Sequence, residues 1–169
     1  MLMSASSLPG DLFAANPLTV ACTLGNVGRQ LTFNALVDTG ATGYSFIDEV
    51  IAQTVCDRLK IEPQRLVKPK PLKGFDGRPG QAITHAIYPT MTVHEHVETV
   101  TPMLVTSLGN HPIILGKPWM NKHHVMLDMT EDKVVFRKEN CCATGGPAPN
   151  STNPAMGSRS GPLPRAPRS

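Results

Sequence analysis

Residues 35–43 read ALVDTGATG and place an aspartate at the end of a short apolar run. The run Leu31–Val37 is typical of a buried strand. Acids, threonines and glycines end strands in many proteins, so the triplet that begins at Asp38 has a plain structural reading. The functional reading is that Asp38 is a catalytic carboxylate, Thr39 holds the loop through its hydroxyl, and Gly40 lets the backbone approach the acid.

The functional reading requires a second carboxylate. Carboxylates hydrolyse an unactivated peptide when one ionised group takes a proton from water and one neutral group donates a hydrogen bond to the carbonyl. Two acids that share one proton supply both groups, because close like charges cannot both ionise. The chain contains Asp-Thr-Gly only once. We therefore expect the partner acid to be Asp38 of a second copy, with the site on a two-fold axis.

Composition predicts one small globular domain. The chain has 169 residues, of which 40% are hydrophobic, and this leaves little room for two cores. The net charge of +3 is modest and the basic residues are spread along the chain, so we expect neither nucleic acid nor a membrane as a partner. No stretch approaches the ~20 apolar residues of a membrane span, and the first residues lack a signal-peptide pattern. We expect a cytoplasmic protein.

The ends of the chain differ in composition from its middle. Residues 1–16 are small and polar, and residues 141–169 are rich in Pro, Gly and Ser, so we expect both segments to be disordered. Residues 17–140 then form the folded domain. The cysteines at 22, 56, 141 and 142 match neither a metal clip nor a disulfide scaffold, which favours free thiols.

The middle segment predicts a mostly β domain with one or two short helices. Runs 18–24 and 30–38 flank a turn-forming segment and predict a hairpin. Residues 46–60 have apolar residues near helical spacing, with acids early and bases late, and predict a helix. Two alternating runs flank GFDGRPG (74–80) and predict a second, longer hairpin. Further strands are expected at 90–96, 101–108, 111–115, 125–129 and 133–136, with a helical turn at 117–123.

Three motifs occur in this order along the chain: ALVDTGATGYSFID (35–48), GFDGRPG (74–80) and IILGKPWM (113–120). Together they resemble a retropepsin, the aspartic protease of retroviruses and long-terminal-repeat retrotransposons. The longer string at 115–136 is similar to the sequence that follows the protease core in gypsy-type retrotransposons, including those of fungi. The resemblance covers residues 18–136 and implies a homodimeric acid-protease β-barrel with a flap hairpin.

The resemblance also implies roles for individual residues. The matching positions are Asp38 as the catalytic acid, Thr39, Gly40, Ala41 and Thr42 in the active-site loop, Gly74, Phe75, Asp76, Gly77 and Arg78 in the substrate-binding flap, and Ile114, Leu115 and Gly116 beside the catalytic strand. Viral relatives commonly brace the dimer with an acid and an arginine at the positions of Thr42 and Lys117. Because this chain lacks that pair, we expect its dimer to separate more readily.

The sequence thus predicts an aspartic endopeptidase that cleaves a peptide or polyprotein, in the cytoplasm or within virus-like particles. No metal or organic cofactor is expected, because water is the nucleophile. The alternative is a catalytically silent, domesticated module for dimerisation or peptide binding. If a single chain were active, Asp76 and Asp128 would be the first candidates for the second acid.

Histidines offer a competing metal-site hypothesis. His94 and His96 flank Glu95 on the expected strand 90–96, where both rings would share one face, and His85 or His111 would complete a zinc site. The simpler interpretation, which we favour, is that these residues form the solvent-exposed face of a strand.

Other residues also have plain readings. The pairs at 123–124 and 141–142 do not supply a tetrahedral set by themselves. Trp119, the only tryptophan, is expected to anchor the core. Phe75 has two open readings, core packing or contact with bound peptide.

Overall fold

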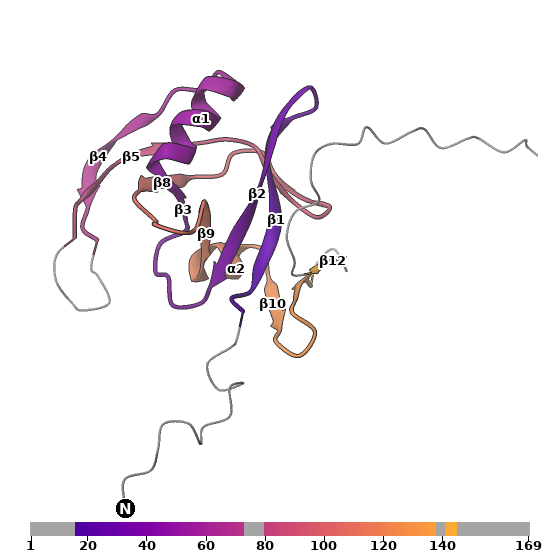
Figure 1. Cartoon of the computed structure of the whole chain (residues 1–169). Helices are drawn as coiled ribbons and strands as arrows, with labels where there is room; N and C mark the ends of the chain where they lie inside the picture. Colours follow the sequence, from indigo (N-terminus) through magenta and orange to yellow (C-terminus); the bar gives the residue numbers. More distant parts are fainter. Residues whose placement is uncertain (1–15, 73–79, 138–140, 145–169) are drawn as a thin grey trace, which may run out of the picture.

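A curled sheet of nine strands dominates the computed structural model (Figure 1). The structure describes residues 16–72 and 80–137 and the backbone of 141–144. In chain order its strands are β1 (Thr19–Asn26), β2 (Arg29–Asp38), β3 (Ser45–Asp48), β4 (Gln64–Lys70), β5 (Ile83–Ile87), β6 (Met91–Val93), β7 (His96–Glu98), β8 (Met103–Thr106) and β9 (Ile113–Gly116). Their order across the sheet is β4-β5-β8-β3-β9-β2-β1-β6-β7. The predicted mostly β fold is confirmed, as a half-barrel.

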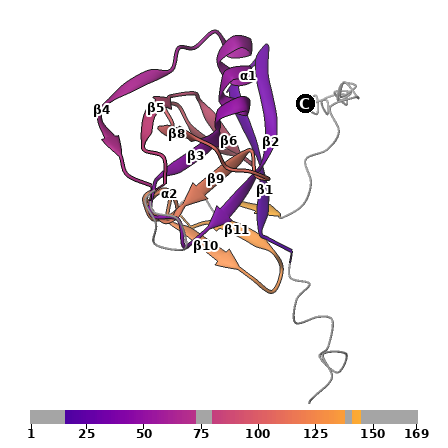
Figure 2. The same cartoon turned by 60° about the vertical axis from the view of Figure 1, so that its left-hand side comes forward.

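Two helices and a small second sheet complete the fold. Helix α1 (Glu49–Leu59) follows β3, and helix α2 (Lys117–Lys122) follows β9 directly. The second sheet contains β10 (Val125–Asp128), β11 (Lys133–Phe136) and β12 (Cys141–Thr144). Helix α1 and the β10–β11 hairpin lie at opposite ends of the molecule (Figure 2). Strand β12 extends the β structure beyond residue 140, the expected end of the domain.

The first predicted hairpin is confirmed. Strands β1 and β2 pair antiparallel from Thr19↔Leu36 to Asn26↔Arg29. Gly25 and Gly28 have positive φ angles of 101° and 94° at the turn, a conformation that glycine adopts without a steric penalty. The hairpin therefore carries Asp38 to the end of a long central strand.

The predicted helix is confirmed, but it begins three residues later than expected. Phe46–Asp48 are part of β3, which pairs with β8 and β9 and buries Ile47 in the sheet. Asp48 then caps the helix, since its carboxylate accepts from the backbone N–H of Val50 at 3.0 Å. Lys60 ends the helix in the left-handed conformation.

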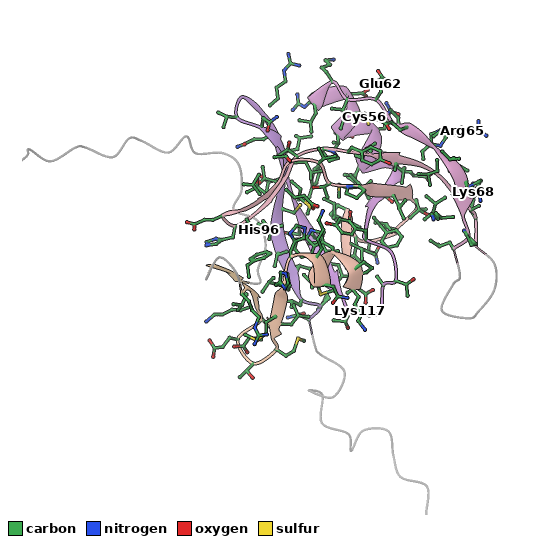
Figure 3. All side chains as sticks on the ribbon, turned by 180° about the vertical axis from the view of Figure 1, so that it is seen from behind. Cys56, Glu62, Arg65, Lys68, His96 and Lys117 are labelled. Atoms are coloured by element: carbon green, nitrogen blue, oxygen red, sulfur yellow. The ribbon has the colours of Figure 1, made fainter. Side chains whose placement is uncertain are left out.

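The second predicted hairpin is confirmed at its base, where β4 and β5 pair antiparallel. The expected flap residues 74–78 lie outside the described residues. Strand β4 is an edge of the sheet, and Arg65 and Lys68 lie along it (Figure 3).

The prediction of one strand over 90–96 is wrong. Strand β6 ends at Val93, His94 takes a left-handed φ of 55°, and β7 returns antiparallel with Val93 opposite His96. A chain reversal separates the two imidazoles that the zinc hypothesis placed on one strand face. Within 16–72 and 80–137, no group of three or more His, Cys, Asp or Glu side chains could hold a metal ion.

The core contains Trp119, which is fully buried and meets Phe136 edge to face at 6.0 Å between ring centroids. The prediction that Trp119 anchors the core is confirmed. Cys22 and Cys56 are buried free thiols, and burial raises the pKa of Cys22 to about 12. Among the described helices, none is long and apolar enough to cross a membrane.

Candidate active site

Asp38 is the last residue of β2 and lies opposite Gly116, the last residue of β9. The two strands are parallel, so both end at the same edge of the sheet. Ile114 and Leu115 lie beside Leu36 and Val37 in the same register. The motifs around Asp38 and Gly116, far apart in the sequence, therefore meet at one point.

The Asp38 carboxylate is held by the loop that follows it. Its Oδ1 atom accepts a hydrogen bond from the backbone N–H of Gly40 at 2.8 Å, and the Asp38 carbonyl accepts from the Ala41 N–H at 3.2 Å. A Cβ atom at Gly40 would lie 3.2 Å from that Oδ1, closer than most such contacts. The absence of a side chain at Gly40 thus lets the backbone donor approach the acid.

The loop 39–44 packs on Gly116. The Gly116 N–H donates to the Tyr44 carbonyl and the Lys117 N–H donates to the Ala41 carbonyl, each at 3.0 Å. A Cβ atom at Gly116 would lie 1.9 Å from the Gly43 carbonyl oxygen, which is a severe clash. Only glycine allows the loop to lie against β9 in this way.

Comparison with known families decides the relationship. The sequence matches the family model described as the PEG10/RTL1 protease domain over residues 34–145, which include the loop, β9, α2 and the small sheet.

The chain belongs to this protease-domain family.

Structural comparison agrees with the assignment. The chain is similar to the retroviral protease-like domain of Ddi1 from Leishmania major, with a TM-score of 0.56 and 19% identity over 82% of this chain and 99% of that one. At this identity the likeness shows a shared fold. No curated protein sequence matches the chain significantly. The predicted retropepsin-like fold is confirmed, whereas gypsy-type and fungal relationships stay predictions.

The protease domain leaves its two loop threonines at the surface. Thr39 and Thr42 are exposed, and the Thr39 hydroxyl makes no hydrogen bond within the described part of this chain. Within residues 16–72 and 80–137 the structure shows no loop-holding bond from this hydroxyl, and the predicted role of Thr39 stays a prediction. Lys117 is also exposed, and it lies at the edge of the molecule on α2 (Figure 3).

Asp128, one alternative second acid, already has a structural role. Its Oδ1 atom accepts from the backbone N–H groups of Thr130 at 3.0 Å and Glu131 at 3.1 Å, in the turn between β10 and β11. Asp76, the other alternative, lies outside the described residues.

Two hollows of about 470 and 500 Å³ lie around the β1–β2 turn and the end of α1, at the other end of β2 from Asp38. Asp38 lines neither of them and lies half-buried at the C-terminal end of β2.

One further polar cluster lies beside the loop, and no motif or spacing in the sequence indicated it. Glu98, at the end of β7, accepts from the Tyr44 hydroxyl at 2.6 Å and from the Lys122 ammonium at 2.7 Å, both at Oε1. Its partners come from the loop 39–44 and from α2, so the cluster joins three segments of the protease domain.

Proposed function

We propose that this protease domain is an aspartic endopeptidase whose site is completed by Asp38 of a second copy. The observation that carries the proposal is the geometry of Asp38, a half-buried carboxylate fixed by the Gly40 N–H on a loop clamped against Gly116. Because the chain has one such triplet, and Asp38 is partly exposed at the end of β2, a second chain is the natural source of the other acid.

The proposed chemistry uses one proton shared between the two Asp38 carboxyl groups. The ionised carboxylate takes a proton from a water molecule as its oxygen attacks the peptide carbonyl carbon. The neutral carboxyl group donates a hydrogen bond to the carbonyl oxygen, which gains negative charge as the tetrahedral intermediate forms. Transfer of a proton to the amide nitrogen then allows the carbon–nitrogen bond to break.

The proposed substrate is an extended peptide, such as a segment of a retroelement polyprotein. Edge strand β4, which carries Arg65 and Lys68, has backbone groups that an extended peptide can pair with. The exposed Thr39 hydroxyl is available to a second chain at the same edge as Asp38.

Incubation with a library of extended peptides tests the proposal, with and without a transition-state mimic of aspartic proteases. Cleavage that the mimic blocks, and that Asp38→Asn removes, is the expected result. The matched control is Asp57→Asn, because Asp57 is an exposed acid on α1 whose hydrogen bond is to Gln53. Binding of peptides without cleavage would instead favour the silent dimerisation or peptide-binding module, and cleavage that persists in Asp38→Asn would overturn the mechanism.

A further inference from the structure

The cluster behind the active-site loop contains a buried charge. The Glu98 side chain is only 8% exposed. Burial alone raises the pKa of its carboxyl group, but the hydrogen bonds from Lys122 and Tyr44 and the charge of His123 outweigh burial, so the pKa lies below its ordinary value. Glu98 is therefore ionised at neutral pH, and Tyr44, whose pKa is raised by burial and by Glu98, remains a donor.

Two imidazoles extend this cluster. His96 Nε2 lies 2.6 Å from His123 Nδ1, and His123 Nε2 lies 3.0 Å from the Tyr44 hydroxyl oxygen. His123 Nε2 is also 3.3 Å from Glu98 Oε2, which has no hydrogen-bond partner in the described residues. We call His96 and His123 the imidazole pair.

The protons of the cluster can be assigned from its contacts. The Tyr44 hydroxyl has one proton and donates it to Glu98, so it accepts from the Nε2–H of His123. His123 Nδ1 then accepts from the Nε2–H of His96. Each of these contacts has one donor and one acceptor when His123 is neutral.

Only one proton fits between the two facing nitrogens of the imidazole pair. If both rings were cationic, each would point an N–H at the other across 2.6 Å, and the contact would have to open. The pair therefore holds one positive charge with its contact intact, but not two. Phe136 stacks on His96 with ring centroids 4.4 Å apart, and Trp119 lies 5.1 Å from His123, which leaves little space for adjustment.

The pH at which His123 gains a second proton depends on the groups that face its ring. His96 and Glu98 approach from β7, Lys122 from α2 and Tyr44 from the active-site loop. Burial lowers the pKa of His123, the Glu98 carboxylate opposes this effect, and the charges of His96 and Lys122 add to it. Acidification that adds a second proton to the pair therefore opens its 2.6 Å contact.

The cluster is connected to the catalytic acid through a short path. Tyr44 ends the loop that begins at Asp38, and its carbonyl accepts from the Gly116 N–H. Helix α2 starts right after Gly116 and ends at the residues that contact Glu98. The loop is thus held by β9 through its backbone and by the cluster through the Tyr44 side chain.

We propose that Tyr44, Glu98 and the imidazole pair are positioning residues that hold the Asp38 loop in place, and that protonation of both imidazoles releases the loop and sets the acidic limit of catalysis. The loop-holding part stands on the contacts alone, and the catalytic part rests on the proposed endopeptidase function.

Fluorescence tests the protonation step without any activity. Trp119 is the only tryptophan and lies beside His123, and a cationic imidazole quenches indole emission. Emission should fall as the pH drops below about 6.5, the ordinary range for histidine. His123→Gln should abolish this change, and His85→Gln, at an exposed histidine on β5, should leave it unaltered. A pH-independent emission, or an equal change in His123→Gln, would overturn the proposal.

Amide hydrogen exchange tests the release of the loop. The Gly116 and Lys117 N–H groups donate to loop carbonyls, so after correction for intrinsic rates they should exchange roughly tenfold faster once the pair opens. His96→Gln keeps a side-chain amide at that position but cannot become cationic, and it should preserve slow exchange at acidic pH. Equal acid-induced exchange in His96→Gln and in the unmodified chain would contradict the proposal.

Kinetics tests the catalytic part. His96→Gln should extend the acidic limb of the kcat profile to lower pH, whereas Tyr44→Phe should lower kcat more than it changes KM, because it loosens the loop and leaves the substrate contacts. Unchanged kcat profiles in both variants would refute the catalytic part, even where exchange supports the loop-holding part. If the chain cleaves nothing, the fluorescence and exchange results still decide the loop-holding part.

Discussion

Asp38 and Glu98 are both carboxylates near the same loop, yet their surroundings are opposite. Asp38 is half-buried at the end of β2, and within the described residues its carboxylate accepts one backbone hydrogen bond, from Gly40. Glu98 is buried and contacts a tyrosine hydroxyl, an ammonium group and an imidazole. Glu98 is thus held by side chains of its own chain, whereas the Asp38 carboxylate has a single backbone donor within the described residues and is partly exposed to a further partner.

Loss of the Asp38 carboxylate should have the largest effect on peptide cleavage. Asp38→Asn should lower cleavage at least about a thousandfold, because it removes both the base and the shared proton. The melting temperature should stay nearly constant, since the amide oxygen still accepts from Gly40. Peptide cleavage and calorimetry on the same samples provide the measurement. An unfolded variant would show that Asp38 is a structural acid like Glu98.

Loss of the buried acid should act on stability instead. Glu98→Ala removes the acceptor of Tyr44 and Lys122 and should cost roughly 3 kcal/mol of unfolding free energy. Glu95→Ala, in the exposed turn beside β7, should change stability by less than about 0.5 kcal/mol. Urea denaturation of both variants measures the difference. Similar losses of unfolding free energy in the two variants would show that Glu98 does not have the structural role that distinguishes it from Asp38.

Acid should weaken the fold through the buried cluster. The pKa of His123 lies below its ordinary value of 6.5, so the unfolded chain binds that proton more readily and stability falls as the pH drops below 6.5. The pKa of Glu98 lies below its ordinary value of 4.5, so its contribution is present above that pH and is lost below it. Denaturation between pH 7 and 3.5 should show both losses, and His123→Gln should lack the first.

Sharing of the site between chains should appear on dilution. Specific activity should fall as dimers separate. When the unmodified chain is mixed with an excess of Asp38→Asn chains, activity should fall below the value expected from the fraction of unmodified chains. Activity assays over a concentration series, with sedimentation in parallel, measure both effects. Constant specific activity in a solution of monomers would place both acids in one chain.

The smallest expected effect comes from restoring the dimer brace. Thr42→Asp combined with Lys117→Arg introduces an acid and an arginine at two exposed positions, and should tighten the dimer by about 1 kcal/mol or less at low salt. The single changes should each have less effect than the pair. A dimer dissociation constant measured at two salt concentrations checks both statements.

Local sequence signals predicted the strands that meet at the site. The alternating run before Asp38, the glycines of the first turn and the IILG segment each depend on residues close in sequence. The boundary of α1 was wrong because Ile47 is also needed by the sheet, and the sheet prevailed over the helical spacing.

Tertiary contacts explain what the sequence could not provide. Glu98, in the alternating polar run HEHVETV, reads as a surface residue until α2 packs over it. Its partners Tyr44 and His123 come from distant segments, and no spacing rule relates them. The strand reading of 90–96 failed because His94 turns the chain, and no glycine marks that turn.

The parallel pairing of β2 with β9 also determines the stage of chain synthesis at which the Asp38 site can form. The acid is made early in the chain, but the strand that supports its loop is made much later, and contacts this far apart in sequence form slowly. A nascent chain that ends before Gly116 carries Asp38 without the surface on which its loop rests. Synthesis through β9 is therefore required before the loop after Asp38 has the strand on which it packs.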